Sequence, residues 1–170
     1  MVGRLIKNDN WKEKVNLTYE EYYKSPPHPG EAYIALVREM EKILGKGKAH
    51  EILMESRRKH VGASVRRRLG DKKIISLRDF INLPRPPIYQ WALIREDVEA
   101  SDERYVFKIH SCLWAKTWIE LGAPDIGYLA TCCSDHFAAK AMNPRLKLTR
   151  KGTIMQGAPC CDFCYTWSDE

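Results

Sequence analysis

The chain has 170 residues, of which 44% are apolar and 29% are charged, a balance typical of a folded globular domain. This composition excludes a disordered chain and a collagen-like one. No stretch approaches the roughly 18 consecutive apolar residues that a membrane-spanning helix needs, so we expect no membrane association. No apolar signal-peptide core follows the first ten residues, which predicts a cytoplasmic protein.

Charge and cysteine are divided unequally between the two halves of the chain. The net charge is +6; residues 1–85 contain 19 Lys and Arg against 11 Asp and Glu, whereas residues 86–170 contain 9 against 11. All six cysteines lie in the second half. We therefore expect a helical N-terminal region, 1–85, and an α+β cysteine-rich region, 86–170, together forming one compact domain. The boundary is predicted at the prolines 84, 86 and 87.

Three helices are predicted in the first half. From Pro29, apolar residues recur every three or four positions up to Leu44, and Gly45 follows where a left-handed C-cap is expected. A second amphipathic pattern starts near Ala49 and ends near Gly70. A short helix over 77–81 is predicted after Ser76, which can cap it.

The second half is predicted to form a small sheet with inserted helices. Strands are expected over 91–98, 105–110, 146–155 and 161–167, with a turn at 101–103, another turn at 156–159 and a bulge at Gly152. One helix is expected after Ser111 as its cap and another from near Asp125 to Asn143-Pro144, with Cys133 and Phe137 on its apolar face. The predicted fold class is α+β, a helical N-terminal region followed by a small antiparallel β-sheet flanked by helices.

A basic run occupies the second predicted helix, with Arg57, Arg58 and Lys59 followed by Arg66, Arg67 and Arg68. Clustered Lys and Arg favour nucleic acid because they displace counterions from phosphates. No nucleic-acid-binding motif accompanies the run and Glu51 and Glu55 dilute it, so nucleic acid is the disfavoured interpretation. A solvated helix face, an anionic ligand and an acidic partner remain alternatives.

The cysteines permit a metal site as one hypothesis. Cys133-x-x-His136 and Cys161-x-x-Cys164 provide four ligands in two closely spaced pairs, a pattern that zinc sites use. A strand over 161–167 would point Cys161 and Cys164 to opposite faces, which opposes that hypothesis. We predict no cofactor, with zinc or iron on these four residues as the alternative; the other alternative is that the cysteines are small buried hydrophobic residues.

A catalytic interpretation draws on the polar residues of the predicted 125–142 helix and its C-terminal end. Cys132 and His136 are four residues apart, and on a helix the imidazole would lie beside the thiol and lower its pKa. Asp135 can serve as a general base, and Cys112 ends a predicted strand nearby. The alternative for any one of these residues is a purely structural role.

Several short motifs between Tyr105 and Tyr165 resemble the L-2-amino-thiazoline-4-carboxylic acid hydrolase family. The matching features are Phe107-x4-Cys112 before a helix, Cys133-x-Asp135, Asn143-Pro144, Thr153-x3-Gly157 and Cys161-x-Phe163. The pattern Gly157-x3-Cys161-x-Phe163 is also similar to the end of 4-vinyl-reductase-type ligand-binding domains, in which helices flank an antiparallel sheet.

The resemblance to the hydrolase family implies that a small cyclic amidine is opened at its C–S or C–N bond. Water, or first a protein nucleophile, would add to the electrophilic ring carbon, and loss of the ring sulfur would give an N-carbamoyl-cysteine. Asp135 is then expected as the base or amidine-binding carboxylate, Cys112 or Cys161 as the nucleophile and His136 as the proton donor. The expected substrate-binding residues are Asn143, His110, Arg145 and Arg150, with Lys108 also near.

Two functions from different classes follow. The first is a hydrolase whose partner is a small molecule with a carboxylate, and it predicts that Cys112, Asp135 and Cys161 converge. The second is a noncatalytic metal- or small-ligand-binding or sensing domain of the vinyl-reductase type. A homo-oligomer is compatible with either.

Overall fold

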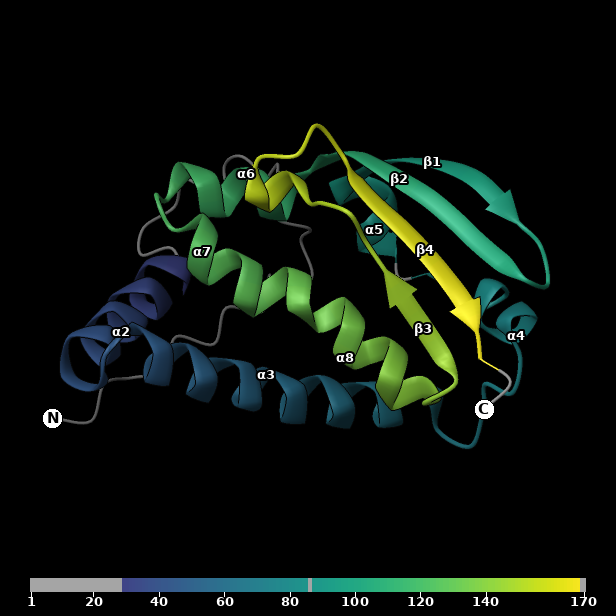
Figure 1. Cartoon of the computed structure of the whole chain (residues 1–170), viewed down its shortest axis with the longest axis horizontal. Coiled ribbons are helices and arrows are strands. Elements are labelled where there is room, and N and C mark those ends of the chain that lie inside the picture. Colours follow the sequence, from purple (N-terminus) through teal and green to yellow (C-terminus); the bar gives the residue numbers. More distant parts are fainter. Residues whose placement is uncertain (1–28, 86, 169–170) are drawn as a thin grey trace, which may run out of the picture.

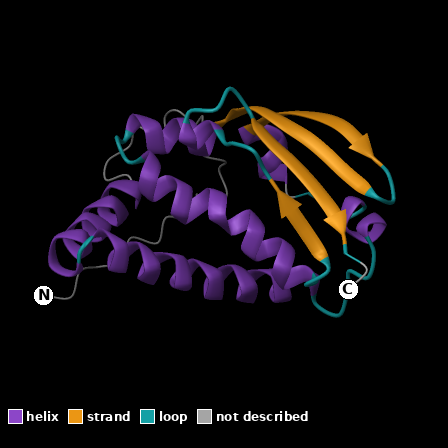
Figure 2. Ribbon diagram, viewed as in Figure 1, coloured by secondary structure: helices purple, strands orange, loops and turns teal. Residues whose placement is uncertain are grey.

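The computed structural model describes residues 29–85 and 87–168. Residues 1–28 of the predicted basic N-terminal region, and Pro86 of the predicted boundary, lie outside the described residues. Four antiparallel strands form one sheet in the order β1-β2-β4-β3, and helices lie against one side of it (Figures 1 and 2). The predicted α+β class is confirmed.

The N-terminal helices form where the sequence predicts them. Helix α2 spans Pro29–Leu44, and α3 spans Lys46–Leu69 and is capped by Gly70. Gly45 between them has a φ of 78°, which is unstrained for glycine alone and allows the chain to reverse. Helix α4, Leu77–Ile81, begins at Ser76, whose hydroxyl accepts a hydrogen bond from the Asp79 amide at 3.1 Å.

The prediction from the sequence lacks one helix and places the start of another helix at the wrong residue. Trp91 lies in helix α5, Pro87–Ala92, and not in a strand; β1 spans Leu93–Ala100. Proline is favourable at the first position of a helix, so Pro87 starts a helix at the point where only the boundary between the two halves was predicted. Strand β2, Arg104–Cys112, continues past Ser111, and α6, Leu113–Glu120, therefore has Cys112 and not Ser111 at its N-cap.

The predicted 125–142 helix contains an irregular turn. It consists of α7, Pro124–Gly127, the π-helical turn η2, Tyr128–Cys132, and α8, Cys133–Met142. A π turn inserts about one extra residue and rotates the following face. Along this segment Ile126, Ala130 and Ala139 are buried, whereas Cys133 and Phe137 of the predicted apolar face are only partly buried.

The strand predicted over 146–155 is shorter than expected. Strand β3 spans Leu146–Thr149, and a short 3-10 turn η3, Ile154–Gln156, precedes β4, Cys161–Trp167. The carboxylate of Asp162 accepts hydrogen bonds from the amides of Lys151 and Gly152 at 2.9 Å, which replaces ladder bonds. Gly152 is therefore part of a loop held by Asp162 and not a β-bulge.

The core fixes the helices against the sheet. Alternate residues of β2, β3 and β4 face inward and pack with Leu77 of α4 and Ala139 of α8. Phe107 and Phe163 stack on neighbouring strands with ring centroids 4.5 Å apart. Helix α3 of the N-terminal half lies beside α8 (Figure 1), so both halves of the chain contribute to the layer of helices that covers the inner face of the sheet.

Candidate active site

A cavity of about 330 Å³ lies between the inner face of the sheet and helices α3 and α8. We call it the cysteine cavity; it is lined by Arg57, Tyr89, Leu93, Ile109, Cys112, Trp114, Ala130, Thr131, Cys132, Ser134, Asp135, Arg150, Cys161 and Phe163. The three residues expected to converge, Cys112, Asp135 and Cys161, all line this one cavity. They arrive from the end of β2, from α8 and from the start of β4.

Asp135 is the acidic residue of this cavity. Its Oδ2 accepts a hydrogen bond from Arg150 Nη1 at 2.7 Å, whereas its Oδ1 makes no hydrogen bond within the described residues. The Asp135 side chain keeps 40% of its exposure, and it lines the cavity. Burial raises the pKa of Asp135 to about 6, although the charge and hydrogen bond of Arg150 lower it. A carboxylate of this kind is basic enough to accept a proton near neutral pH.

Arg150 holds Asp135 in place. Its side chain is only 4% exposed, and its Nη2 donates a hydrogen bond to the carbonyl of Cys132 at 2.7 Å. The guanidinium also lies over the Phe163 ring, 4.9 Å from the centroid. Arg150 thus connects the loop after β3 to Cys132 at the end of the π turn and to Asp135 on α8.

The thiols of the cavity are protonated at neutral pH. Burial raises the pKa of Cys112 and of Cys161, and it raises the pKa of Cys132 to about 12. Asp135 adds to each effect through its negative charge. Cys161 also accepts a hydrogen bond at its Sγ from the Ile154 amide at 3.2 Å, which fixes its orientation. These surroundings favour neutral thiols that donate hydrogen bonds over resting thiolates.

A second arginine reaches the cavity from the N-terminal half. Arg57 of α3 lines the cavity, and its Nη2 donates a hydrogen bond to Ser134 Oγ at 3.1 Å. Its Nε is buried and has no hydrogen-bond partner among the residues that the structure describes. A buried donor left without a partner costs about 1 to 3 kcal/mol, which a ligand acceptor would relieve. The cavity therefore offers both a carboxylate and a guanidinium donor to a bound molecule.

A model of the L-2-amino-thiazoline-4-carboxylic acid hydrolase family matches residues 30–165 of the chain. The chain belongs to this family. No curated protein matches it. The family match extends over the helical half, which supplies Arg57, as well as over the cysteine-rich half. Every helix in the described part is too short or too polar to cross a membrane.

The family motifs identified from the sequence surround the cavity. Thr153 and Gly157 delimit the η3 turn: the Thr153 carbonyl accepts hydrogen bonds from the amides of Gln156 and Ala158, and Gly157 has a φ of 88°. This turn places the Ile154 amide against Cys161. Phe107 and Phe163, the stacked pair, lie on β2 and β4, the same strands that carry Cys112 and Cys161. The Thr153-x3-Gly157 and Cys161-x-Phe163 motifs thus position a thiol as well as a turn.

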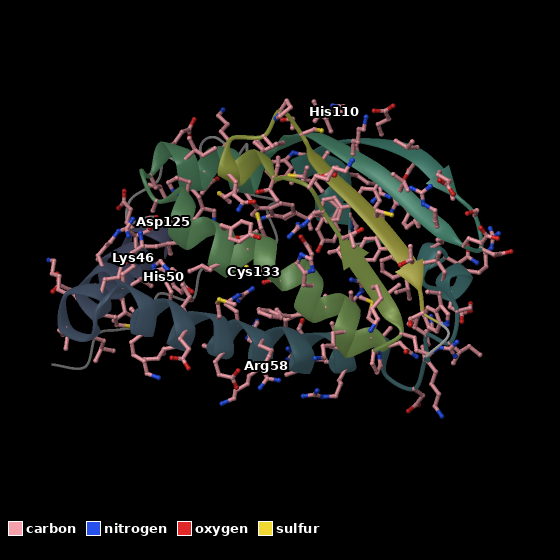
Figure 3. The ribbon with its side chains drawn as sticks, in the orientation of Figure 1. Lys46, His50, Arg58, His110, Asp125 and Cys133 are labelled. Carbon is pink, nitrogen blue, oxygen red and sulfur yellow. The ribbon has the colours of Figure 1, made fainter. Side chains whose placement is uncertain are left out.

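Four of the residues predicted for this hydrolase-family site lie outside the cysteine cavity. His136 is exposed and does not line the cavity, and partial desolvation together with the charge of Arg150 lowers the pKa of its imidazole, which disfavours an imidazolium that could activate Cys132. His110 is exposed on the sheet and pairs with Glu96 at 2.7 Å (Figure 3). Asn143 donates to the Ile74 carbonyl at 2.9 Å and accepts from the Arg145 amide. Arg145 donates to the Ser168 carbonyl at 2.6 Å. Lys108 is likewise exposed and does not line the cavity.

The alternative metal set does not come together. Cys161 is on the inner face of β4, and Cys164, three residues later, points to the other face, as strand geometry requires. Cys133 and His136 are both on α8, and His136 is exposed. Within residues 29–85 and 87–168, the one group with three potential ligand atoms close enough for an ion is Glu41, His50 and Asp125. Lys46, His50 and Asp125 lie at the opposite end of α3 from the sheet (Figure 3).

Arg57 is the functional candidate that sequence reasoning missed. The sequence presents it as part of a basic helix face, and its partner Ser134 is 77 positions further along the chain. The available signal was the charge of that run, for which an anionic ligand was one interpretation. The structure separates the run: Arg57 reaches the cavity, whereas Arg58 points away on the outer side of α3 and pairs with Glu55 (Figure 3).

Proposed function

We propose that the protein hydrolyses a small cyclic amidine that bears a carboxylate, of the 2-amino-thiazoline-4-carboxylate type. The observation that carries this proposal is the Asp135 carboxyl, whose pKa is raised to about 6, in a cavity that also holds Cys112 and Cys161. Membership of the hydrolase family supports the reaction class. The substrate assignment extends that family name to this chain.

In the proposed reaction, Asp135 accepts a proton from a water molecule while the water oxygen adds to the ring carbon between sulfur and nitrogen. The C–S bond then breaks and the ring sulfur receives the proton held by Asp135, while the hydroxyl proton of the adduct passes to the ring nitrogen, so that the carbon becomes a urea carbonyl. The product is an N-carbamoyl-cysteine, and one water molecule is consumed. Arg150 holds the carboxylate through Oδ2, so Oδ1 is the oxygen assigned to the water.

The neutral thiols suit a supporting role in this scheme. A thiol with a raised pKa is a weak nucleophile but can donate a hydrogen bond to the sulfur that leaves. We therefore assign the attack to water activated by Asp135, and we assign Cys112 and Cys161 to orientation of the ring. This replaces the expected cysteine nucleophile and the expected His136 proton donor.

We assign the substrate carboxylate to Arg57. Its unpartnered Nε and its Nη2, which contacts Ser134, present two donors on one edge of a guanidinium, the arrangement that binds carboxylates in a bidentate manner. Arg150 is already occupied by Asp135 and the Cys132 carbonyl. The amidine of the substrate would then lie toward Asp135.

The test uses 2-amino-thiazoline-4-carboxylate and, as a matched compound, 2-amino-2-thiazoline, which lacks the carboxylate. Two assays detect ring opening. The protein is removed by filtration and the free thiol in the filtrate is measured, and mass spectrometry tests for a product heavier than the substrate by one water. We expect turnover of the acid, and we expect Arg57→Met to raise KM for the acid by about 30-fold with little change in kcat. Arg58→Met is the control on the outer side of α3 and should behave like the wild type.

Two results would overturn the proposal. Binding of the acid without thiol release would favour the noncatalytic small-ligand-binding alternative. Equal kcat and KM for the acid and for the compound without a carboxylate in the wild type would show that Arg57 does not recognise the substrate carboxylate.

A further inference from the structure

A second cavity adjoins the cysteine cavity. It has a volume of about 190 Å³, and it shares Tyr89, Leu93, Ile109, Asp135 and Phe163 with the cysteine cavity. Asp135 therefore lies at the junction of two spaces, only one of which the reaction proposed above uses. We call the second space the aromatic cavity, and its walls away from Asp135 include Phe80, Tyr105, Phe107 and Tyr165.

The walls of the aromatic cavity suit a flat apolar group. Phe107, Phe163 and Tyr165 are stacked nearly parallel, with interplanar angles of 13° to 21°. Phe80 approaches Tyr165 from α4, with ring centroids 4.5 Å apart. Aromatic faces aligned in this way favour offset stacking with a further planar ring.

Three arginines line the same cavity: Arg68, Arg85 and Arg95. Arg85 and Arg95 both contact the Tyr105 hydroxyl, and Arg95 lies over the Phe107 ring, 3.4 Å from its centroid. Asp97 pairs with Arg95 and lies 3.7 Å from Arg85, and Arg68 donates to the Pro84 carbonyl at 2.9 Å. Because Asp135 is paired with Arg150, Asp97 is the remaining carboxylate that the described residues place beside these three guanidinium groups, which leaves an excess of positive charge and favours an anion.

The basic run of α3 serves both cavities. Arg57 lines the cysteine cavity and Arg68 lines the aromatic cavity. They are eleven residues apart, about three helical turns or roughly 16 Å along α3, and so share a face of that helix. The two cavities therefore lie along one face of α3.

We propose that the aromatic cavity is a second binding compartment, for a planar aromatic group that carries an anionic substituent. For the substrate, this inference rests on the proposed hydrolase function: the ring that is opened lies at Asp135, and an aromatic extension with its anion lies toward Arg85 and Arg95. The substrate class of this chain is then larger than the bare thiazoline acid.

The test measures binding of naphthalene-2-carboxylate and of the neutral naphthalene-2-carboxamide to the full chain by calorimetry at pH 7. We expect the carboxylate to bind about ten-fold more tightly, because one charge-assisted contact adds at least that factor. Arg85→Ala should remove the difference between the two probes, and Ala138→Leu, which narrows the aromatic cavity, should weaken both. Arg78→Ala, an exposed arginine paired with Asp102, is the control and should change neither.

Circular dichroism shows whether each variant is folded, and wild-type binding is informative without any variant. Equal affinity for the two probes, absence of binding, or an Arg85→Ala variant that still distinguishes them would overturn the proposal. The hydrolysis assay separates the two proposals. If the probe binds but the thiazoline acid is not opened, the second binding compartment is supported and the proposed hydrolysis is contradicted. If the acid is opened but the probe does not bind, the hydrolysis is supported and the second compartment is contradicted.

Discussion

Asp125 and Asp135 lie ten residues apart on the same helical segment, and each faces an arginine, but their surroundings differ. Asp125 receives hydrogen bonds from Arg38 at 2.8 and 2.9 Å and an ion pair from Lys46 at 3.3 Å. Hydrogen bonding from Arg38 holds the pKa of Asp125 well below its usual range. Asp135 has one arginine on one oxygen, and burial raises its pKa to about 6.

The difference separates an ion-pair network from a candidate reactive group. At Asp125, hydrogen bonds to the charged form dominate. Arg38, which also pairs with Glu41, and Lys46 together compensate the Asp125 carboxylate. At Asp135, the loss of hydration dominates and leaves a carboxylate with affinity for a proton. An arginine partner alone therefore does not identify the function of an acidic residue.

The largest expected effect is on hydrolysis by Asp135→Asn. Removal of a general base costs about 10³-fold in kcat, measured as thiol release from 2-amino-thiazoline-4-carboxylate. Asp125→Asn is the matched variant on the same segment and should keep wild-type kcat in the folded protein. Equal losses in the two variants would contradict the distinction between these carboxylates.

Arg150→Met tests the support of Asp135. It leaves a buried carboxylate without its cation, and we expect the free energy of unfolding to fall by about 2 to 3 kcal/mol in urea titrations. Because Arg150 lowers the pKa of Asp135, its removal should also move the rise of kcat/KM to higher pH. Arg145→Met, whose arginine donates to the Ser168 carbonyl outside the cavity, should leave that pH profile unchanged.

Gly127, between the two carboxylates, tests the packing of the segment that carries both. A Cβ at this position would lie 2.4 Å from the Trp118 ring, so Gly127→Ala should lower the free energy of unfolding by about 1 to 3 kcal/mol. Gly62→Ala is the control within α3, where a Cβ meets only ordinary contacts and where alanine should be neutral or slightly stabilising. Chemical denaturation of both variants measures the difference; equal stability would indicate that the contact relaxes freely.

The smallest expected effect is the opposite pH dependence of stability for the two carboxylates. Between pH 4 and 6 the folded protein retains a proton on Asp135 that the unfolded chain releases, so this residue makes stability fall as pH rises. Asp125 has a lowered pKa, so its stabilisation is present above the unfolded pKa and is lost as pH falls. Relative to wild type, Asp135→Asn should therefore become less destabilising as pH rises from 4 to 6, whereas the effect of Asp125→Asn should stay nearly constant in that range and shrink only below pH 4; parallel trends would contradict this sign.

Local signals explain which parts of the fold the sequence predicted. Gly45, Ser76 and the alternation in β2 and β4 act within a few residues, and the elements that they mark form as expected. The π turn has no local signal, so the sequence predicts one continuous helix where the structure has three segments. Asp135, Cys112, Cys161 and Arg150 were identified because motifs or nearby sequence indicated them. Arg57 was not, because its role depends on contacts across the fold.

The most direct test of the central claim is the pH titration of the Asp135 carboxyl by carbon NMR, with Asp135→Asn used to assign the signal. We expect a titration midpoint near pH 6 for Asp135 in the wild type, and a higher midpoint in Arg150→Met. A midpoint near or below pH 4 in the folded wild type would show that Asp135 is compensated as Asp125 is, and it would remove the basis for a general base in this cavity.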